Sequence, residues 1–192
     1  MASDDFNRTE DPLSTGWATG MGGLSNIKAN GTDAQGTSAA ADHVAVRTGT
    51  YPDDQFSEVV IGTQGDDGGP LVRGSTTAAQ GYFVDTSGNL TVLIIRLDAG
   101  PSFTVIATVS FGAANTAGAV YRLTIAGSVL TPTRNGATGT LVSGSLTDAT
   151  YASGSPGIHL FDTALTYDSW NGTDPAGGAT TILPQMMAHH GG

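Results

Sequence analysis

The sequence predicts an all-β protein folded as a sandwich of two antiparallel sheets. Short runs of alternating apolar and polar residues are separated by Gly, Asn, Pro or Ser, which is typical of half-buried strands joined by turns. No segment of useful length has helical periodicity, because Gly and Asn interrupt the Ala-rich stretches 37–42 and 112–119. A chain of 192 residues, 39% of them hydrophobic, suits one sandwich with its own core.

The expected strands follow one another along the whole chain, each as an apolar run bounded by turn residues. In order they are residues 5–7, 17–19, 24–29, 43–48, 55–61, 70–74, 81–84, 90–97, 103–111, 120–125, 129–133, 139–143 and 157–166. The turns between them include DDGG at 66–69, SGN at 87–89 and AGP at 99–101. Many short strands separated by turns indicate a sandwich or a barrel.

Three segments carry the clearest packing information. The segment 121–136 predicts a hairpin in which residues 121, 123 and 125 share one face, GS at 127–128 forms the turn, and NG at 135–136 gives a second turn signal. The continuous apolar run VLII at 92–95 predicts a central strand that is covered on both faces. The strict alternation from Phe103 to Phe111 predicts a strand whose odd-numbered residues, all apolar, share one face, with the even-numbered residues, Ile106 among them, on the other.

Composition and charge exclude several classes of function. The net charge is −10 and the chain has only 7 Lys and Arg residues, so the basic surface of a DNA- or RNA-binding protein is missing. The absence of cysteine excludes disulfides, Cys-zinc sites and thiol catalysis. An acidic surface suits solubility, calcium, or a basic partner.

The two ends of the chain also carry expectations. The opening segment MASDDFNRTEDPL has neither the basic start nor the apolar stretch of a signal peptide, and the run at 92–95 is far too short to span a membrane. We therefore expect a chain that is complete from its initiating methionine and is made in the cytoplasm. From residue 172 the sequence is rich in Gly and Pro and loses alternation, which predicts one β-sandwich over 1–171 and an extended tail over 172–192.

Six motifs occur in order between residues 4 and 171: DDFNRTEDPLSTGW, YPDDQFSEVVI, GGPLVRGS with GYFV, YRLTIAGSVLTPTRNG, TDATYASGSPGI and FDTALTYDSWNG. The first resembles the opening D-x-F-x-R…P-L-G…W of the concanavalin A-like lectin/glucanase superfamily in its laminin-G-like form. The fourth resembles that family's hairpin L-R-L-x-V-x-G-x-x-L-x-x-x-x-N-G, and the fifth its T-D-x-x-Y-x-x-G-x-P-G-I. The resemblance implies an antiparallel β-sandwich jelly roll.

The resemblance further implies that the first and last strands pair and close the sandwich. Phe6 and Trp170 are then expected near one another in the core, and Arg8 is expected to pair with Asp5 or Asp168 at the seam. The fold alone does not give the function, since it hosts lectins, hydrolases, adhesins and virion surface proteins.

A glycosidase site is not indicated. The hydrolase branch of this fold uses the pattern E-x-D-x-(x)-E, because a nucleophile and an acid about 5 Å apart must flank the scissile bond. The chain has no glutamate after Glu58, and Asp53, Asp54 and Glu58 do not reproduce the pattern. We expect Glu58 to pair with Arg47 or Arg73. GDDGGP at 65–70 resembles a serine-protease motif but has aspartate at the serine position, so we expect no enzyme activity.

Three tyrosines are candidates for binding carbohydrate. Tyr51, Tyr82 and Tyr151 have amphipathic rings that suit a sugar-stacking surface. The alternative is that they belong to the core, because a sandwich with few aromatic residues is expected to bury most of them.

We expect no cofactor, with calcium as the alternative. The resemblance implies an ion at the sandwich rim held by Asp and Asn, and Asp66, Asp67, Asp85 and Asn89 are the candidate ligands. They form no recognised calcium loop, and aspartate in a turn commonly caps the backbone, so solvated turns are the alternative. His43 and His159 stand alone on strand-like runs and are expected at polar positions on the edge of the core.

The sequence thus predicts a non-catalytic structural or interaction protein. Because DDFNRTEDPL resembles phage-encoded domains, we expect a bacteriophage virion surface protein, either a capsid decoration protein or a minor structural protein. Its partners would be viral capsid or tail proteins, bound in repeated copies through edge strands and the tail. One alternative is a carbohydrate-binding module of a tail or adhesin, with glycans as ligands. A glycan hydrolase or lyase is the other alternative.

Overall fold

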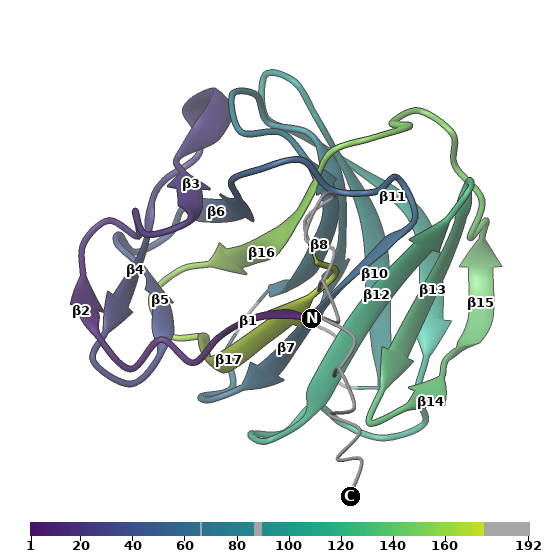
Figure 1. The fold of residues 1–192 in the computed structure, drawn as a ribbon. Helices are drawn as coiled ribbons and strands as arrows, with labels where there is room; N and C mark the ends of the chain where they lie inside the picture. Colours follow the sequence, from purple (N-terminus) through teal and green to yellow (C-terminus); the bar gives the residue numbers. More distant parts are fainter. Residues whose placement is uncertain (66, 87–89, 175–192) are drawn as a thin grey trace, which may run out of the picture.

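Two antiparallel sheets pack face to face in the computed structural model, which describes residues 1–65, 67–86 and 90–174 (Figure 1). The all-β sandwich that the sequence predicts is confirmed. Within the described residues the one helical element is the short 3-10 turn η1 (Met21–Gly23), and no helix there has the length and hydropathy of a membrane span.

The first sheet, sheet A, contains both ends of the domain. Its strand order is β14-β13-β12-β7-β17-β5-β4-β2, and β1 also pairs with β17. The strands are β1 (Ala2–Asp4), β2 (Thr9–Glu10), β4 (Ile27–Asn30), β5 (Ala34–Gly36), β7 (Gln55–Ile61), β12 (Val120–Ala126), β13 (Val129–Arg134), β14 (Ala137–Thr138) and β17 (Thr166–Gly172).

The second sheet, sheet B, has the order β15-β11-β10-β9-β8-β16-β6-β3. Its strands are β3 (Trp17–Thr19), β6 (Asp42–Arg47), β8 (Gly68–Gly74), β9 (Gly81–Asp85), β10 (Thr91–Asp98), β11 (Ser102–Ser110), β15 (Thr140–Gly144) and β16 (Ser155–Phe161). Neighbouring strands in both sheets run antiparallel, both within hairpins and between strands that are distant in the sequence.

The hairpin of β12 and β13 forms as the sequence predicts. Ala126 pairs with Val129 across the two-residue turn, and Gly127 has the positive φ of 57° that this turn requires. The second turn signal is also confirmed, because Asn135 and Gly136 have φ values of 50° and 80° where β13 turns into β14. Alternate residues of β12 are buried, so the predicted inward face is correct.

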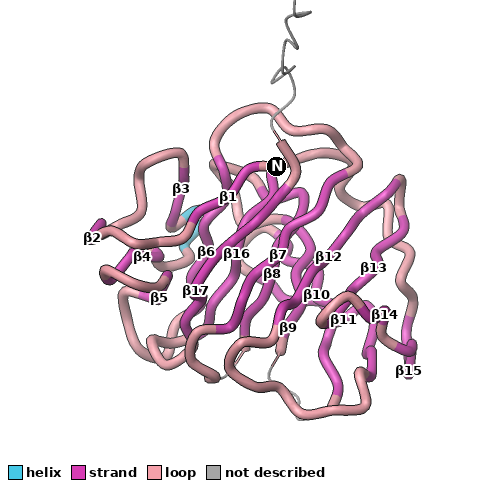
Figure 2. Tube along the Cα trace, turned by 60° about the horizontal axis from the view of Figure 1, so that its bottom comes forward, coloured by secondary structure: helices cyan, strands magenta, loops and turns pink. Residues whose placement is uncertain are grey.

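The predicted seam between the chain ends is confirmed. Ala2 pairs with Gly172 at the start of the β1–β17 ladder, and Figure 2 shows β1 lying along β17. The Trp17 ring lies 5.1 Å from that of Trp170 and 6.0 Å from that of Phe6, measured between centroids. Phe6 and Trp170 are fully buried in the same core cluster.

The expected partners of Arg8 are wrong. Its guanidinium pairs with Asp4 at 2.6 Å and with Glu10 at 2.8 Å, and not with Asp5 or Asp168. The reason is strand geometry. β1 ends at Asp4, whose side chain is turned into the seam, whereas Asp5 is exposed and accepts the backbone N–H of Asn7 at 3.2 Å.

Sheet B is covered on both of its faces. The main core fills the space between the sheets, and a second buried cluster lies on the outer face of sheet B. Neighbours on β6 show this arrangement, because Ala45 belongs to the main core whereas Val44 and Val46 belong to the outer cluster. Likewise, Ile94 packs in the main core and Ile95 in the outer cluster, which confirms that the run at 92–95 is covered on both faces.

A β-bulge overturns the prediction that the odd-numbered residues of 103–111 share one face. Ile94 pairs with Ala107 and Ile95 pairs with Val105, so Ile106 is an extra residue on β11. The extra residue reverses the alternation. Ala107 and Val109 face the core, while Phe103 and Val105 face outward and are 39% and 53% exposed.

The remaining differences concern short elements and one long run. The predicted strand 157–166 is two strands, β16 and β17, because the chain turns at Asp162, which has φ 68°. The predicted strand at 5–7 is a loop in which Phe6 has φ 52°, and β1 precedes it. The two- and three-residue strands β2, β5 and β14 carry too few residues for a periodic signal. β17 runs through Gly172, and most of the predicted tail, 175–192, lies outside the described residues.

Candidate functional site

The outer face of sheet B contains a hollow of about 260 Å³, called here the outer-face hollow. It lies over β11, β10, β9, β8, β16 and β6, which follow one another in this order across sheet B. Its lining combines aromatic and aliphatic side chains with carboxylates and one imidazole: Asp42, Asp67, Phe83, Asp85, Ile95, Phe103, His159 and Phe161.

The floor of the outer-face hollow is a packed aromatic group. The Phe83 ring stacks on His159 with centroids 4.0 Å apart and an interplanar angle of 26°. The Phe103 ring meets both edge-on, at 6.1 Å from Phe83 and 6.0 Å from His159. Phe83 and His159 are each 1% exposed, whereas Phe103 is 39% exposed, so Phe103 is the ring of this trio that a ligand can touch.

The imidazole of His159 is fixed by a carboxylate at the rim. Its Nε2 lies 3.1 Å from Asp42 Oδ1, and the side chain of Asp42 is 31% exposed. Within the described residues Nδ1 of His159 is buried without a hydrogen-bond partner. His159 is 1% exposed and His43 is fully buried, so both lie below the surface and not at the edge of the core.

Three carboxylates give the outer-face hollow an excess of acceptors. Asp42, Asp67 and Asp85 line it, and no Lys or Arg is among its described lining residues. Hydroxyl donors are the neutral groups that such an arrangement binds, because ionised carboxylates accept hydrogen bonds and donate none.

The candidate calcium ligands are only partly brought together. Asp67 and Asp85 line the same hollow, while Asp66 and Asn89 lie outside the described residues. Over the part of the chain that the structure describes, no group of three or more His, Asp or Glu side chains is placed to hold a metal ion.

The three candidate tyrosines do not form a stacking surface. Tyr51 and Tyr82 are 7% and 0% exposed, so burial leaves no ring face for a sugar. Tyr82 packs against the half-buried Tyr151 at 5.7 Å, and their hydroxyls donate to Asp148 and Asp98, each at 2.8 Å. Burial together with the hydrogen bond to Asp98 raises the pKa of Tyr151 to about 12. Tyr82 and Tyr151 therefore stabilise the rim of the sandwich.

Glu58 lies away from the outer-face hollow, and its predicted partners are wrong. It pairs with Arg122 at 2.8 Å because the two residues are directly opposite on β7 and β12. Arg73 is instead buried at the rim, where it donates to the carbonyl oxygens of Asp53, Gly127 and Tyr151 at distances of 2.7–3.1 Å.

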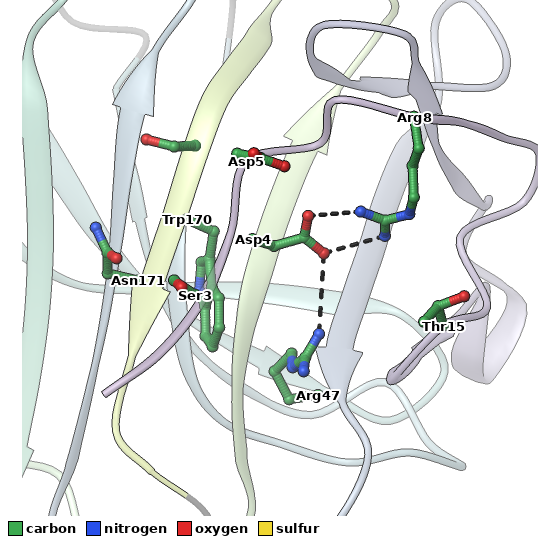
Figure 3. A pocket seen from close by; sticks show the side chains of 9 residues that line it. Ser3, Asp4, Asp5, Arg8, Thr15, Arg47, Trp170 and Asn171 are labelled. Carbon is green, nitrogen blue, oxygen red and sulfur yellow. Dashed lines mark hydrogen bonds and ion pairs between the residues drawn. The ribbon is translucent and has the colours of Figure 1, made fainter.

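A second hollow, of about 580 Å³, lies at the junction of β1 and β17 and is called here the seam hollow (Figure 3). Asp4 occupies its centre. Both carboxylate oxygens of Asp4 accept from Arg8, and they also accept the indole N–H of Trp17 at 2.8 Å and the backbone N–H of Phe6 at 2.9 Å. Burial acts to raise the pKa of Asp4, but these hydrogen bonds outweigh it and lower the pKa. Asp4 is therefore a fully bonded structural residue.

Comparison with known proteins identifies the fold. No protein-family model and no curated protein matches the sequence. Among solved structures, the carbohydrate binding module CBM66 from Bacillus subtilis superposes with a TM-score of 0.67 at 15% identity, covering 83% of this chain and 96% of its own. The metal-free VIP36 exoplasmic/lumenal domain gives 0.58 at 9% identity, covering 90% and 91%.

The GH43 protein BlXynB from Bacillus licheniformis gives a TM-score of 0.56 at 13% identity, and the match covers 89% of this chain but 39% of that protein. Identities this low show the fold alone. They confirm the concanavalin A-like jelly roll that the sequence motifs imply.

Proposed function

We propose that the protein is a carbohydrate-binding module and that the outer-face hollow is its glycan site. The observation that carries the proposal is the combination there of a part-exposed Phe103 ring with three carboxylates and no cationic side chain among the described lining residues. A sugar presents an apolar C–H face and a rim of hydroxyls, which match an aromatic ring and acidic acceptors respectively. Related folds support the class, since CBM66 is named as a carbohydrate binding module and VIP36 has been solved in a Ca²⁺/Man2-bound form.

The roles of the residues follow from their positions. Phe103 packs on one face of the sugar ring, and the stacked pair of Phe83 and His159 holds it in place from below. Asp42 and the half-buried Asp67 accept hydrogen bonds from sugar hydroxyls at the rim. The site is largely preformed, because its floor is part of the buried outer cluster and needs little reordering when a ligand binds.

The test is a glycan array followed by titration calorimetry with the best ligand. Phe103→Ala is compared with Val105→Ala, a matched control on the same face of β11 that is more exposed and does not line the hollow. A phenylalanine side chain has about 200 Å² of surface, so covering its exposed 39% buries about 80 Å². At about 25 cal/mol per Å² that is about 2 kcal/mol, or about thirtyfold in affinity.

We therefore expect Phe103→Ala to weaken binding by about five- to thirtyfold, depending on how much of the ring the sugar covers. Val105→Ala is expected to bind like the parent. Equal affinities for both variants, or no binding to any glycan on the array, would contradict the proposal.

A second candidate function is the expected docking on a virion lattice. The observation in its favour is the edge strand β15, on which Leu141 and Val142 are 46% and 60% exposed. An uncharged edge strand with exposed apolar residues can add a strand from a partner. Co-sedimentation with phage capsids tests this role and the virion location, and loss of pelleting in Val142→Lys is the expected result. A protein that never pellets with capsids would refute it.

We further propose that the protein has no catalytic activity of its own. Glu58 is held by Arg122 and also accepts from Asn171 at 3.3 Å, and both partners lie on sheet A. Release of reducing ends from a bound polysaccharide, lost in Glu58→Gln, would overturn this assignment.

A further inference from the structure

The seam hollow contains an arginine that is held rigidly in place. The Arg47 guanidinium carbon lies 4.9 Å from the centroid of the Trp17 ring and 5.5 Å from that of Trp170. Gly16 borders it on another side, where a Cβ atom would come within 3.0 Å of Nη2. The aromatic rings and the glycine therefore form a cradle that fixes the guanidinium, and its side chain remains 20% exposed at the hollow.

The hydrogen-bonding capacity of Arg47 is largely unused. Its nearest anionic atom is Asp4 Oδ2 at 3.9 Å, which is too far for a hydrogen bond (Figure 3). Asp4 is already bonded to Arg8, Trp17 and the backbone, so it does not serve Arg47. Among the described residues no partner satisfies the buried Nε of Arg47 either. A guanidinium with unmet donors is costly to keep partly buried, so a group that fills the hollow and accepts from Arg47 gains free energy.

Other lining residues of the seam hollow offer acceptors and hydroxyls. Asp5 is exposed and accepts one backbone N–H, from Asn7. Ser3, Thr15 and Ser169 add hydroxyls that both donate and accept. Arg47 with its donors and Asp5 with its acceptors thus both line a space of about 580 Å³, which is large enough for a small ligand.

The charges of the seam hollow favour a neutral ligand. The two arginines that line it, Arg8 and Arg47, are balanced by Asp4 and Asp5. Glu10, bonded to Arg8 at 2.8 Å, adds a further negative charge nearby. An anion therefore gains little net attraction, whereas a residue with several hydroxyls accepts from Arg47 and donates to Asp5 at once.

We propose that the seam hollow is a second saccharide site, which takes one neutral sugar residue that contacts Arg47 and Asp5. It is separate from the outer-face hollow, because its lining comes from β1, β17, the end of β6 and the loops before β2 and β3, and it shares no residue with that site. The protein would then hold glycans at two places on its surface and gain avidity for polysaccharide chains.

The experiment follows the Nε–Hε NMR signal of Arg47 during titration with neutral monosaccharides (glucose, galactose, mannose and fructose) and, separately, with sodium acetate. A saturable shift with at least one sugar and none with acetate is expected. Arg47→Lys keeps the charge but loses the planar guanidinium with its several donors, and Asp5→Ala removes the carboxylate acceptor. Each is expected to weaken sugar binding at this site by about ten- to a hundredfold.

Arg122→Lys, the same exchange at a residue of the outer face of sheet A, is the matched control and is expected to bind like the parent. The Arg47 shift is expected to persist in Phe103→Ala, so failure of the outer-face site and failure of the seam site are distinguishable. If Arg47→Lys does not fold, Asp5→Ala decides, since Asp5 is exposed. No shift with any sugar, a larger response to acetate, or full affinity in Asp5→Ala would overturn the proposal.

Discussion

Replacing Asp4 with alanine is expected to destabilise the sandwich strongly, because this residue fastens β1 to the core. Its side chain is 8% exposed and accepts two bonds from Arg8, one from the indole N–H of Trp17 and one from the backbone N–H of Phe6. Arg8 is 31% exposed and regains water, so its loss is largely screened. Trp17 is 3% exposed and cannot be hydrated, which leaves a buried donor unpaired at a cost of about 1–3 kcal/mol.

Adding the lost charge-assisted bond to Phe6, at about 1.5–3 kcal/mol, gives an expected loss of about 2.5–6 kcal/mol for Asp4→Ala. Urea unfolding followed by tryptophan fluorescence measures it, since both tryptophans lie at this seam. Asp5→Ala is the control and is expected to change stability by no more than about 0.5 kcal/mol, because Asp5 is exposed. A loss below about 1 kcal/mol for Asp4→Ala would refute the role assigned to this residue.

Three further outcomes are expected. Arg73→Met is expected to lower the free energy of unfolding by about 3 kcal/mol and to speed proteolysis of the rim loops, because three carbonyl oxygens lose their hydrogen-bond donor. Unchanged stability would contradict this. Burial acts to raise the pKa values of Glu10 and Asp148, but hydrogen bonds outweigh it and lower both pKa values to about 2. The free energy of unfolding is therefore expected to fall between about pH 4.5 and pH 2, and to fall less steeply with pH in Glu10→Gln and Asp148→Asn. Gly16→Ala is expected to cost at least about 1 kcal/mol in thermal unfolding, because φ is +73° and Cβ meets the Arg47 guanidinium; a neutral effect would show that the cradle adapts.

The sign of the acid effect follows from linkage. A carboxyl group whose pKa is lower in the folded protein binds a proton more readily in the unfolded chain. The stability that Glu10 and Asp148 contribute is thus complete above their ordinary values of 4.5 and 3.8, and it is lost as the pH falls toward about 2. Urea midpoints measured across this range, with each variant beside the parent, test the assignment.

Features of the fold that depend on neighbouring residues in the chain could be predicted from the sequence. The β12–β13 hairpin is such a case, because Gly127 and the Asn135-Gly136 pair dictate the turns locally. The seam between Phe6 and Trp170 is long-range, and it was accessible through the family motifs at the two ends of the domain.

Most of the candidate site could not be predicted from the sequence, for physical reasons. The bulge at Ile106 is a property of the pairing between β10 and β11, and the alternation of apolar residues carries no sign of it. Without the bulge, Phe103 belongs to the core; with it, Phe103 becomes the exposed ring of the outer-face hollow. The tyrosines have the amphipathic rings of a sugar-binding surface, but the carboxylates that accept from their hydroxyls inside the rim are distant in sequence, such as Asp148 for Tyr82.

The most direct test of the account is NMR mapping of the best glycan ligand on the isotope-labelled protein. Saturable shifts of the amide and ring signals of Phe83, Phe103 and Phe161 are predicted, because these residues line the outer-face hollow on sheet B. Saturable glycan binding that leaves all three residues unshifted would contradict the account.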